Sequence, residues 1–398
     1  MSRLRAGDWV EVRSKDDILL TLDKQGRMDG LPFMPQMFQY CGKRYKVYKR
    51  AHKSCDTLAI NWDSPGRSLV DGIHLNLRCD GQAYGGCQAA CMIFWKEQWL
   101  KAVDGPAVLE VHVESPTLTG AACPSEPAGN SRCTQADVER GTRAPELSAS
   151  GETVYVCQAT QHLEYTKPLP WWDARQYLED YTSGNASFWR MVRGGIYVSY
   201  YYGTLAFNRK YGGPARWIYD WFQSLWGGLP FPRHRGKLLD GERGPVANLN
   251  LQAGELVRVK PYEEILKTVH NDNKHRGMVF DGEMMPFCGR TYRVRSRIEK
   301  FIDEKTGVMK TLKSPAVILD NVFCWARYSN HRMFCPRAIY SWWREVWLER
   351  ISEESQPPKD DQKTTTQFTR SIGNARTGNG SSGVHRHDSD AHVGSEGS

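Results

Sequence analysis

The sequence lacks the long apolar run and the leader segment that would direct a chain into or across a membrane. No stretch reaches the roughly 18 apolar residues that a transmembrane helix needs, and the most apolar candidate, residues 194–207, is too short and too polar. The N-terminal residues also lack the apolar core of a secretory signal. Together with 11 cysteines, an odd number, these absences predict a cytoplasmic protein whose clustered thiols serve metal binding or catalysis more readily than disulfides.

The short motifs that identify common enzyme classes are absent as well. The chain has no Walker loop, dinucleotide fingerprint, H-E-x-x-H, G-x-S-x-G or paired C-x2-C zinc-ribbon pattern. An active site assembled from dispersed residues would leave no such motif, so the sequence does not decide whether the protein is an enzyme. The net charge of +8 is compatible with an anionic partner but too small to identify one. Tryptophan, by contrast, is abundant, and its 14 copies favour a broad interface, a ligand groove or a membrane surface.

The most informative feature that is present is an internal repeat. AGDWVEVRSKDDILLTL, starting at Ala6, returns as AGELVRVKPYEEILKTV, starting at Ala253. YCGKRYKVYKR likewise returns as FCGRTYRVRSR, and all matched pairs from Ala6 to Lys53 keep one offset of 247 residues. Residues 94–103 (FWKEQWLKAV) match residues 342–351 (WWREVWLERI). Chance does not preserve register over so many positions, so two homologous segments flank a dissimilar middle.

The residue pattern of each repeat predicts an α+β fold. DWVEVRS and ELVRVKP alternate apolar and polar residues, which is the period of a half-buried strand. DDILLTL and EEILKTV place acidic residues before a short apolar face, as a helix start would. Further strands are expected at GKRYKVYKR, GIHLNLRC and their counterparts, and a closing helix is expected from Cys87 and from Cys335. We therefore expect two strand-rich, SH3-like barrels, each closed by a helix, around a helical and aromatic middle.

Composition divides the chain into six parts. We expect the first repeat at residues 1–103, a loop-rich connector at 104–167, a helical aromatic-rich segment at 168–230 and a linker at 231–252. The second repeat follows at 253–351. Residues 352–398 are rich in Gly, Ser, Thr, Gln and His with almost no large apolar residue, which predicts a disordered tail.

The cysteines of the first repeat are the candidate metal ligands. Cys55, Cys79, Cys87 and Cys91 supply the four thiols that a zinc site or an iron–sulfur cluster requires, with His52 and His74 nearby. Their spacing, C-x23-C-x7-C-x3-C, is not a common zinc-ribbon pattern. The second repeat keeps counterparts of two of the four, Cys324 and Cys335, and has Ile339 in place of Cys91. Such depletion is expected if one duplicate kept a ligand site and the other became structural.

Two other interpretations of the cysteines remain open at this stage. Cys87, Cys91, Trp95 and Trp99 are spaced four apart and would share one stripe of a helix, so the thiols can be core residues. Alternatively, Cys335 before Pro336 would lie at a helix start, where the thiol pKa falls and the thiol becomes reactive. His331 is the nearest base in sequence. The sequence does not show whether Cys123, Cys133, Cys157 and His162 complete the metal site.

Basic strands and aromatic helices supply two further hypotheses. Lys46 and Arg50 in the first repeat and Arg293, Arg295 and Arg297 in the second would present a basic strand face to an anionic ligand or nucleic acid. A solvated, charged face is the simpler interpretation. In ARWIYDWFQSLW (residues 215–226), Trp217 and Trp221 fall on one stripe, which suits either core packing or an interfacial helix on a membrane.

The sequence thus predicts a cytoplasmic protein that binds zinc or an iron–sulfur cluster through Cys55, Cys79, Cys87 and Cys91. It would act as an enzyme or as an accessory protein of a bacterial biosynthetic pathway. A nucleic-acid-binding protein is the first alternative, and a peripheral membrane-associated scaffold is the second.

Overall fold

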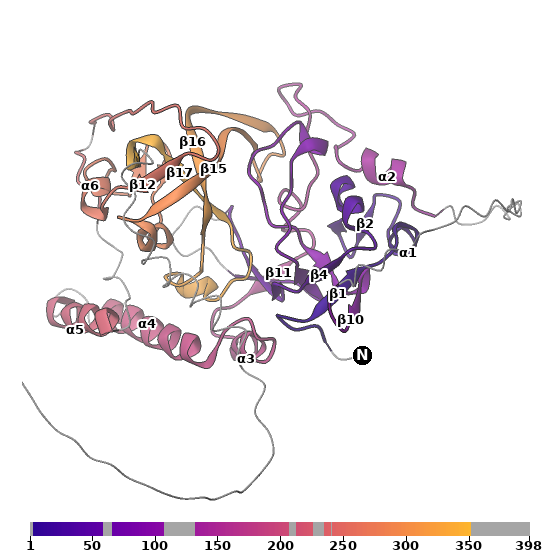
Figure 1. Ribbon diagram of the computed structural model, residues 1–398, viewed down its shortest axis with the longest axis horizontal. Coiled ribbons are helices and arrows are strands. Elements are labelled where there is room, and N and C mark those ends of the chain that lie inside the picture. Colours follow the sequence, from indigo (N-terminus) through magenta and orange to yellow (C-terminus); the bar gives the residue numbers. More distant parts are fainter. Residues whose placement is uncertain are drawn as a thin grey trace, which may run out of the picture. The chain divides into compact units, whose positions relative to one another are not determined.

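Several small antiparallel sheets and a few helices make up the protein, which we describe from a computed structural model (Figure 1). The structure describes residues 3–58, 66–106, 132–206, 212–225, 235–239 and 241–351. The tail predicted at 352–398 lies outside these residues. The mixture of strands and helices confirms the α+β class.

The N-terminal segment, residues 3–106, begins with a three-stranded sheet of order β10-β1-β4. Its elements are β1 (Trp9–Val12), α1 (Lys15–Leu19), β2 (Arg27–Met28), β3 (Leu31–Pro32), a 3-10 turn (Pro35–Tyr40), β4 (Arg44–Lys46) and β10 (Leu100–Val103). Alternation in β1 buries Val10 and Val12 while Trp9 and Glu11 stay half-buried. Ser14 starts α1 because its side chain accepts a hydrogen bond from the Asp17 N–H.

Two further sheets fill the middle of the N-terminal segment. One has the order β5-β8-β9, built from β5 (Lys49–Arg50), β8 (Gly72–His74) and β9 (Trp95–Lys96). The other has the order β11-β7-β6, built from β6 (Lys53–Cys55), β7 (Gly66–Ser68) and β11 (Lys167–Leu169). Because β11 lies across the predicted boundary between the connector (104–167) and the helical segment (168–230), this sheet joins that boundary to the N-terminal segment.

The C-terminal segment, residues 253–351, is organised by one five-stranded sheet of order β17-β16-β15-β12-β18. Its elements are β12 (Leu256–Val259), α6 (Tyr262–Leu266), β13 (Lys274–His275), β14 (Met278–Val279), a 3-10 turn (Gly282–Phe287), β15 (Thr291–Ile302), β16 (Met309–Phe323), β17 (Tyr340–Arg344) and β18 (Leu348–Arg350). The hairpin of β15 and β16 has no counterpart of similar length in the described part of the N-terminal segment.

The two segments place corresponding elements in the same order. β1 pairs with β4 so that Val10 faces Tyr45, and β12 pairs with β15 so that Val257 faces Tyr292. Each segment also has its own buried core. The first contains Trp95 and Trp99 and the second Trp343 and Trp347, all fully buried. These tryptophans occupy the two short stretches that match at the ends of the repeats.

Two expectations about each segment need correction. The described sheets stay open and form no closed barrel, so the SH3-like barrels are not confirmed. The closing helices predicted from Cys87 and Cys335 are wrong, since the described chain is irregular there and then enters β9 and β17. Ala90 and Ala338, which lie within the two predicted helices, have positive φ, a conformation that a regular α-helix does not contain.

Helices dominate the described part of the middle segment, where the sequence predicts them. After α2 (Gln135–Arg140) in the connector come α3 (Ala174–Thr182), α4 (Phe188–Ala206) and α5 (Gly212–Leu225). In Figure 1, α4 and α5 lie side by side, and α3, which precedes α4 in the chain, lies near the N-terminal end of α4. No helix in the described ranges is both long enough and apolar enough to cross a bilayer.

Candidate functional site

A folded-back loop brings three of the predicted ligands together. The Cys79 N–H donates to the Cys91 carbonyl oxygen at 2.9 Å, so the two ends of the loop are joined. Gly81 has φ 71°, and a Cβ on it would stand 1.9 Å from the Cys87 carbonyl oxygen. Only glycine fits this close approach. The glycines between Cys79 and Cys91 therefore allow the chain to reverse within a few residues, which an α-helix would prevent.

The same loop is fixed against β15 of the C-terminal segment. The Gln88 side-chain oxygen accepts hydrogen bonds from the backbone N–H groups of Glu299 and Lys300 at 2.7 and 3.0 Å. The Lys300 ammonium donates to the Gly85 carbonyl oxygen at 2.9 Å. The Ile302 N–H lies 3.4 Å from the Cys87 sulfur. Residues more than 200 positions apart in sequence thus hold the cysteine loop in place.

A cavity of about 300 Å³ lies between this loop and the C-terminal segment. Four thiols line it: Cys79, Cys87, Cys91 and Cys157. The C-terminal segment supplies Phe301, Trp342, Glu304 and Arg337, among others. The remaining wall is largely apolar and includes Met34, Tyr84, Met92, Phe94 and Ile302. A mostly apolar cavity with a few convergent polar groups is the usual form of a ligand or cofactor site.

Burial favours the protonated form of three of these thiols, Cys79, Cys91 and Cys157. It raises the pKa of Cys79 to about 12, and it raises the pKa values of Cys91 and Cys157 above their ordinary range. The Arg337 guanidinium also lines the cavity and is paired with Glu304 at 3.2 Å. A bound soft cation would displace the thiol protons, because metal coordination stabilises a thiolate far more than burial destabilises it.

Cys55, the fourth predicted ligand, lies in a different thiol group. It ends β6 and packs with Cys335 and Ala326, beside Cys324 and Ile339. A hydrogen bond donated by the Cys335 thiol, with the nearby Arg337 and Arg332, lowers the pKa of Cys55 to about 5, and the same contact raises the pKa of Cys335. The Arg337 guanidinium also donates to the Cys55 carbonyl oxygen at 3.1 Å.

The thiols are therefore divided into two groups, with Arg337 adjoining both. Three predicted ligands (Cys79, Cys87, Cys91) share the cavity, and Cys157 stands there in place of Cys55. Cys133 belongs to the N-terminal core, and Cys123 lies outside the described residues. Within the described ranges, no three or more His, Cys, Asp or Glu side chains converge in the way that a single metal ion requires.

The histidines proposed from the sequence do not line the cavity. His52 lies 3.4 Å from Asp180, which also pairs with the buried Lys53. The Nδ1 atom of His74 lies 2.9 Å from the Ile93 carbonyl oxygen. His162 contacts the Ser54 hydroxyl at 2.9 Å. The Nε2 atom of His331 lies 3.1 Å from the Tyr202 hydroxyl, so one contact of this candidate base is with the middle helices.

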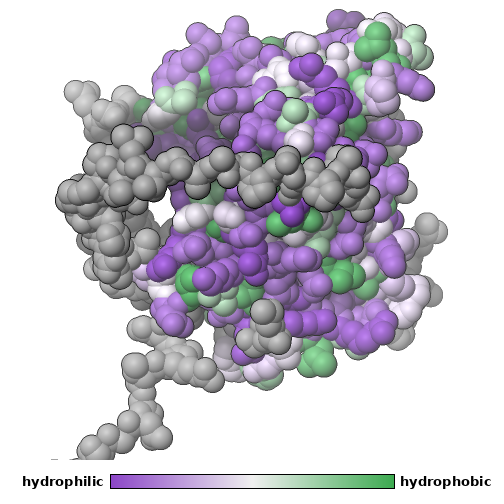
Figure 2. All heavy atoms as spheres, turned by 90° about the vertical axis from the view of Figure 1, so that its right-hand side faces the viewer, coloured by the Kyte–Doolittle hydropathy of each residue, from purple (hydrophilic) through white to green (hydrophobic). Residues whose placement is uncertain are grey.

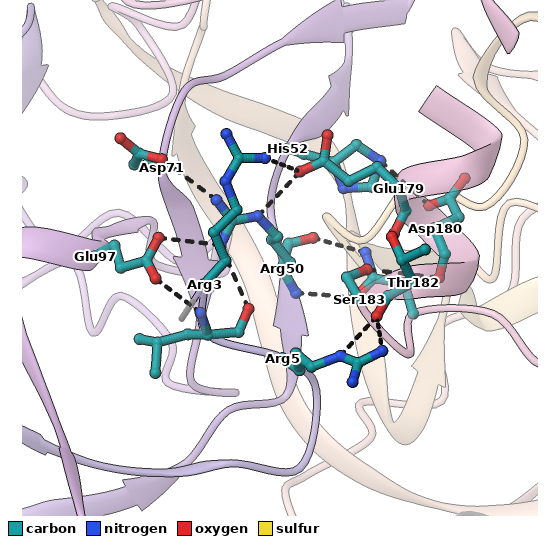
Figure 3. A network of polar contacts seen from close by, with 12 residues as sticks. Arg3, Arg5, Arg50, His52, Asp71, Glu97, Glu179, Asp180, Thr182 and Ser183 are labelled. Carbon is teal, nitrogen blue, oxygen red and sulfur yellow. Dashed lines mark hydrogen bonds and ion pairs between the residues drawn. The ribbon is translucent and has the colours of Figure 1, made fainter. Parts of the chain in front are cut away.

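Among the proposed anion-binding residues, Arg50 is engaged within the protein (Figure 3). Its side chain is 3% exposed and pairs with Glu179 and Glu97 at 3.0 Å and with Asp71 at 3.3 Å. Figure 3 shows the three carboxylates directed toward its guanidinium. Arg50 therefore joins β5 to α3 and leaves little of its charge available to an external anion.

The other proposed anion-binding residues differ in how far their charges are paired within the protein. Arg297 pairs with the buried Glu345 at 2.7 Å, and Arg295 lies 3.4 Å from Asp320. Arg293 is exposed and donates to the Gly254 carbonyl oxygen. Lys46 is exposed at the end of β4. The basic strand face is thus shorter than the sequence suggests, and Lys46, Arg293 and Arg295 carry most of its accessible charge.

Sequence reasoning left the role of Cys157 open and missed the contributions of Arg337 and Trp342 to the cavity. Cys157 follows Cys91 by 66 residues and belongs to the connector, so no spacing pattern links the two. Arg337 and Trp342 come from the C-terminal segment. They follow Cys335, which the sequence suggested as a reactive thiol and not as part of the metal site. Only the folded chain brings these groups together.

Searches against known protein families, curated proteins and solved structures found no significant match for this chain.

Proposed function

We propose that the protein binds a thiolate-ligated metal centre in the cavity formed by Cys79, Cys87, Cys91 and Cys157. The observation that supports this proposal is the meeting of four thiols from two distant segments at one cavity of about 300 Å³. Four thiols on the wall of one cavity supply the complete ligand set of a thiolate site.

Among metal centres, we favour an iron–sulfur cluster over a single zinc ion. Zinc–sulfur bonds of about 2.3 Å place four thiolate sulfurs only about 3.8 Å apart. The described side chains do not converge to that degree. The ligand sulfurs of a four-iron cluster stand farther apart, around inorganic core atoms that need a cavity of their own. The apolar rings of the wall would exclude water, and the Arg337 guanidinium would offset the negative charge of the cluster.

Such a centre would tie three parts of the chain together. The cysteine loop belongs to the N-terminal segment, Cys157 to the connector, and the remaining wall to the C-terminal segment. Ligand binding free energy would therefore also be folding free energy for this region. In this proposal the protein is a cytoplasmic enzyme or accessory protein whose cofactor is held between two copies of one ancestral unit, as the 247-residue offset indicates.

The test is metal analysis of the full chain purified without oxygen. We expect about four irons per chain and a broad absorption band near 400 nm from sulfur-to-iron charge transfer. Stoichiometric zinc without the band would support the same cavity with a different metal. Substoichiometric metal of any kind would overturn the proposal.

Matched variants identify the ligand set. Cys157→Ser should lose the metal, whereas Cys55→Ser should keep it, because Cys55 packs with Cys335 away from the cavity thiols. Cys288→Ser is a control for the removal of a partly buried thiol that packs on the C-terminal core. Retention of full metal by Cys157→Ser together with its loss in Cys55→Ser would restore the ligand set predicted from sequence.

The nucleic-acid alternative has weaker support, because Arg50 and Arg297 are committed to internal carboxylates. It would depend on Lys46, Arg293 and Arg295. Affinity for any nucleic acid should then fall steeply with salt, since phosphate contacts release counterions. No retention of RNA or DNA at low salt would exclude it.

A further inference from the structure

Helix α5 packs on α4 through the less apolar of its two faces. Tyr219 stacks on Tyr200 with ring centroids 4.2 Å apart, and the Gln223 amide donates to the Tyr219 hydroxyl. Gln223 also lies 3.5 Å from the Arg193 guanidinium of α4. Tyr219 and Gln223 are one turn apart and both are buried, so they define the side of α5 that faces the protein.

The opposite face of α5 is apolar and turned toward solvent. Trp217 is 70% exposed, Trp221 54% and Leu225 61%, and these three residues follow one another at intervals of four. Ile218, which is 56% exposed, widens the same face. At about 100° per residue, all four lie within one arc of roughly 100°. A surface helix of a water-soluble protein normally has the reverse arrangement, with its apolar arc against the core.

The described residues on the face seen in Figure 2 do not show such concentration. The face seen in Figure 2, on the side of α1 and α2, is mostly hydrophilic, and its apolar residues lie scattered. Singly exposed apolar residues are normal, whereas a contiguous exposed group marks an interaction surface. Exposed Phe188 and Trp189, at the start of α4, add aromatic surface to the same pair of helices.

The charge of this region indicates which partner the apolar face fits. Residues 207–237, which are α5 and its flanks, hold six lysines and arginines against one acidic residue, Asp220. This stretch therefore has a net formal charge of +5 within a chain whose total is +8. Basic residues beside a Trp- and Leu-rich helix face are the combination that binds anionic lipid surfaces, where tryptophan prefers the headgroup boundary.

We propose that α5 docks the protein on an anionic lipid surface. The helix would lie in the plane of the interface, with Trp217, Trp221 and Leu225 at the acyl boundary and the basic flanks among the headgroups. It does not span the membrane, since its 14 residues fall short of the roughly 20 that a crossing needs. The thiol-lined cavity belongs to other elements, so docking and metal binding are separate properties of the chain.

The test is sedimentation of the full-length chain with vesicles of phosphatidylcholine alone or mixed with phosphatidylserine. We expect binding to the mixed vesicles, at least about tenfold weaker binding to the neutral ones, and loss of affinity as salt rises. The double variant Trp217→Ser/Trp221→Ser should reduce binding by about tenfold or more. Its metal content should be unchanged, which separates this test from that of the proposed function.

A matched pair of leucines controls for general loss of apolar surface. Leu225→Ser removes a side chain that is 61% exposed on α5, and Leu147→Ser removes one that is 65% exposed in the connector. We expect severalfold weaker binding for the first and no change for the second. Equal binding of the wild type to neutral and anionic vesicles would overturn the role of charge. Absence of vesicle binding, with self-association that the tryptophan variants abolish, would overturn the lipid proposal and assign the face to a second copy of the chain.

Discussion

The N-terminal and C-terminal segments share their polar anchors although their sheets differ in size. In each, a buried tryptophan donates to a threonine hydroxyl: Trp99 to Thr21 at 3.0 Å and Trp347 to Thr268 at 2.9 Å. Each threonine in turn donates to the carbonyl oxygen of an isoleucine three residues earlier, at 2.7 Å. The contacts that close each core are therefore of the same kind, and they are made by residues 247 or 248 positions apart in the sequence.

An arginine and a glutamate form a second shared anchor. Arg50 contacts Glu97 and the Leu4 carbonyl oxygen, at 3.0 and 3.3 Å. Arg297 contacts Glu345 and the Leu251 carbonyl oxygen, at 2.7 and 3.2 Å. In both segments this pair fastens the strand that carries the arginine, β5 or β15, to the 3-10 turn near the end of the segment.

The two segments differ in structure along the chain between the arginine and the glutamate of these pairs. The candidate site lies in these differing stretches. After β5 the N-terminal segment continues through short strands and the cysteine loop, whereas the C-terminal segment forms the long hairpin of β15 (12 residues) and β16 (15 residues). The end of β15, at Phe301 and Ile302, lines the cavity together with the cysteine loop. Shared residues thus maintain the two cores, and the divergent stretches build the cavity between them.

The largest expected effects test whether the two tryptophan anchors are equivalent. Trp99→Ala and Trp347→Ala should each lower the free energy of unfolding by about 3–5 kcal/mol, because each removes a fully buried indole. Thr21→Val and Thr268→Val should cost less, about 1–3 kcal/mol each, since they leave an indole N–H without its acceptor. Urea unfolding of the full chain measures all four. A large loss in one segment with none in the other would break the correspondence.

The arginine anchors should be unequal. Arg50 is 3% exposed and contacts three carboxylates, whereas Arg297 is 18% exposed and its shortest contact is with Glu345. Arg50→Ala should therefore cost about 3–5 kcal/mol, and Arg297→Ala about 1–3 kcal/mol. The same urea experiment ranks them. An equal or reversed order would mean that the bonds from Arg50 to α3 contribute nothing to stability.

The pH dependence of stability separates the Cys55–Cys335 pair from the cavity thiols. Between pH 5 and about 8.5, the usual thiol pKa, folded Cys55 binds fewer protons than unfolded Cys55, because its folded pKa is about 5. Stability should therefore rise with pH across this window and fall toward pH 5. Above about 8.5 the raised pKa of Cys335 acts in the opposite direction, since the folded state then holds more protons.

The measurement is the urea midpoint of the wild type and of Cys55→Ser between pH 5.0 and about 9.5. The rise below about pH 8.5 should be present in the wild type and reduced in the variant. Cys79→Ser should keep the rise, because a pKa raised to about 12 gives that thiol no titration in the window. A wild-type curve parallel to that of Cys55→Ser would contradict the low pKa of Cys55.

Local patterns predict the parts of the fold that local forces decide. The alternation of β1 and β12 and the acidic starts of α1 and α6 are visible in the sequence, because burial of one strand face and capping of a helix need only neighbouring residues. The closing helix of the N-terminal segment was wrongly predicted, although the residue spacing that suggested it is real. Trp95 and Trp99 do share a core with a spacing of four, but one lies in a strand and the other in a 3-10 turn.

The candidate site depends on long-range contacts and was only partly predictable. The grouping of Cys79, Cys87 and Cys91 follows from their nearness in sequence. The exchange of Cys55 for Cys157 does not, because it is decided by how β6 packs on Cys335 and how the connector returns to the loop. The positive φ of Ala90 could not be predicted from the sequence either, because alanine is a strong helix former.

The smallest expected effect of side-chain packing alone comes from exchanging the residues that differ at one matched position of the two segments. Cys91→Ile introduces the side chain that the C-terminal segment carries as Ile339, which packs beside Cys335. Overpacking should cost about 1–3 kcal/mol at most. If Cys91 is a metal ligand, however, the variant should lose its metal and its absorption band even though the fold is retained.

The reciprocal variant sharpens this test. Ile339→Cys should reduce stability by about 1 kcal/mol, through loss of apolar volume, and should leave the metal content unchanged. Metal content and the urea midpoint must both be measured. Loss of the metal identifies a ligand, whereas a lower midpoint with full metal content identifies a core residue. Cys91→Ile that keeps its full metal would remove Cys91 from the site and leave Cys79, Cys87 and Cys157 as the thiols of the cavity. Loss of metal with the fold retained is the outcome we expect, since Cys91 lines the cavity and Ile339 packs against the other thiol group. The urea midpoint of Cys91→Ile should then lie below that of Ile339→Cys, because the binding free energy of the metal is lost as well.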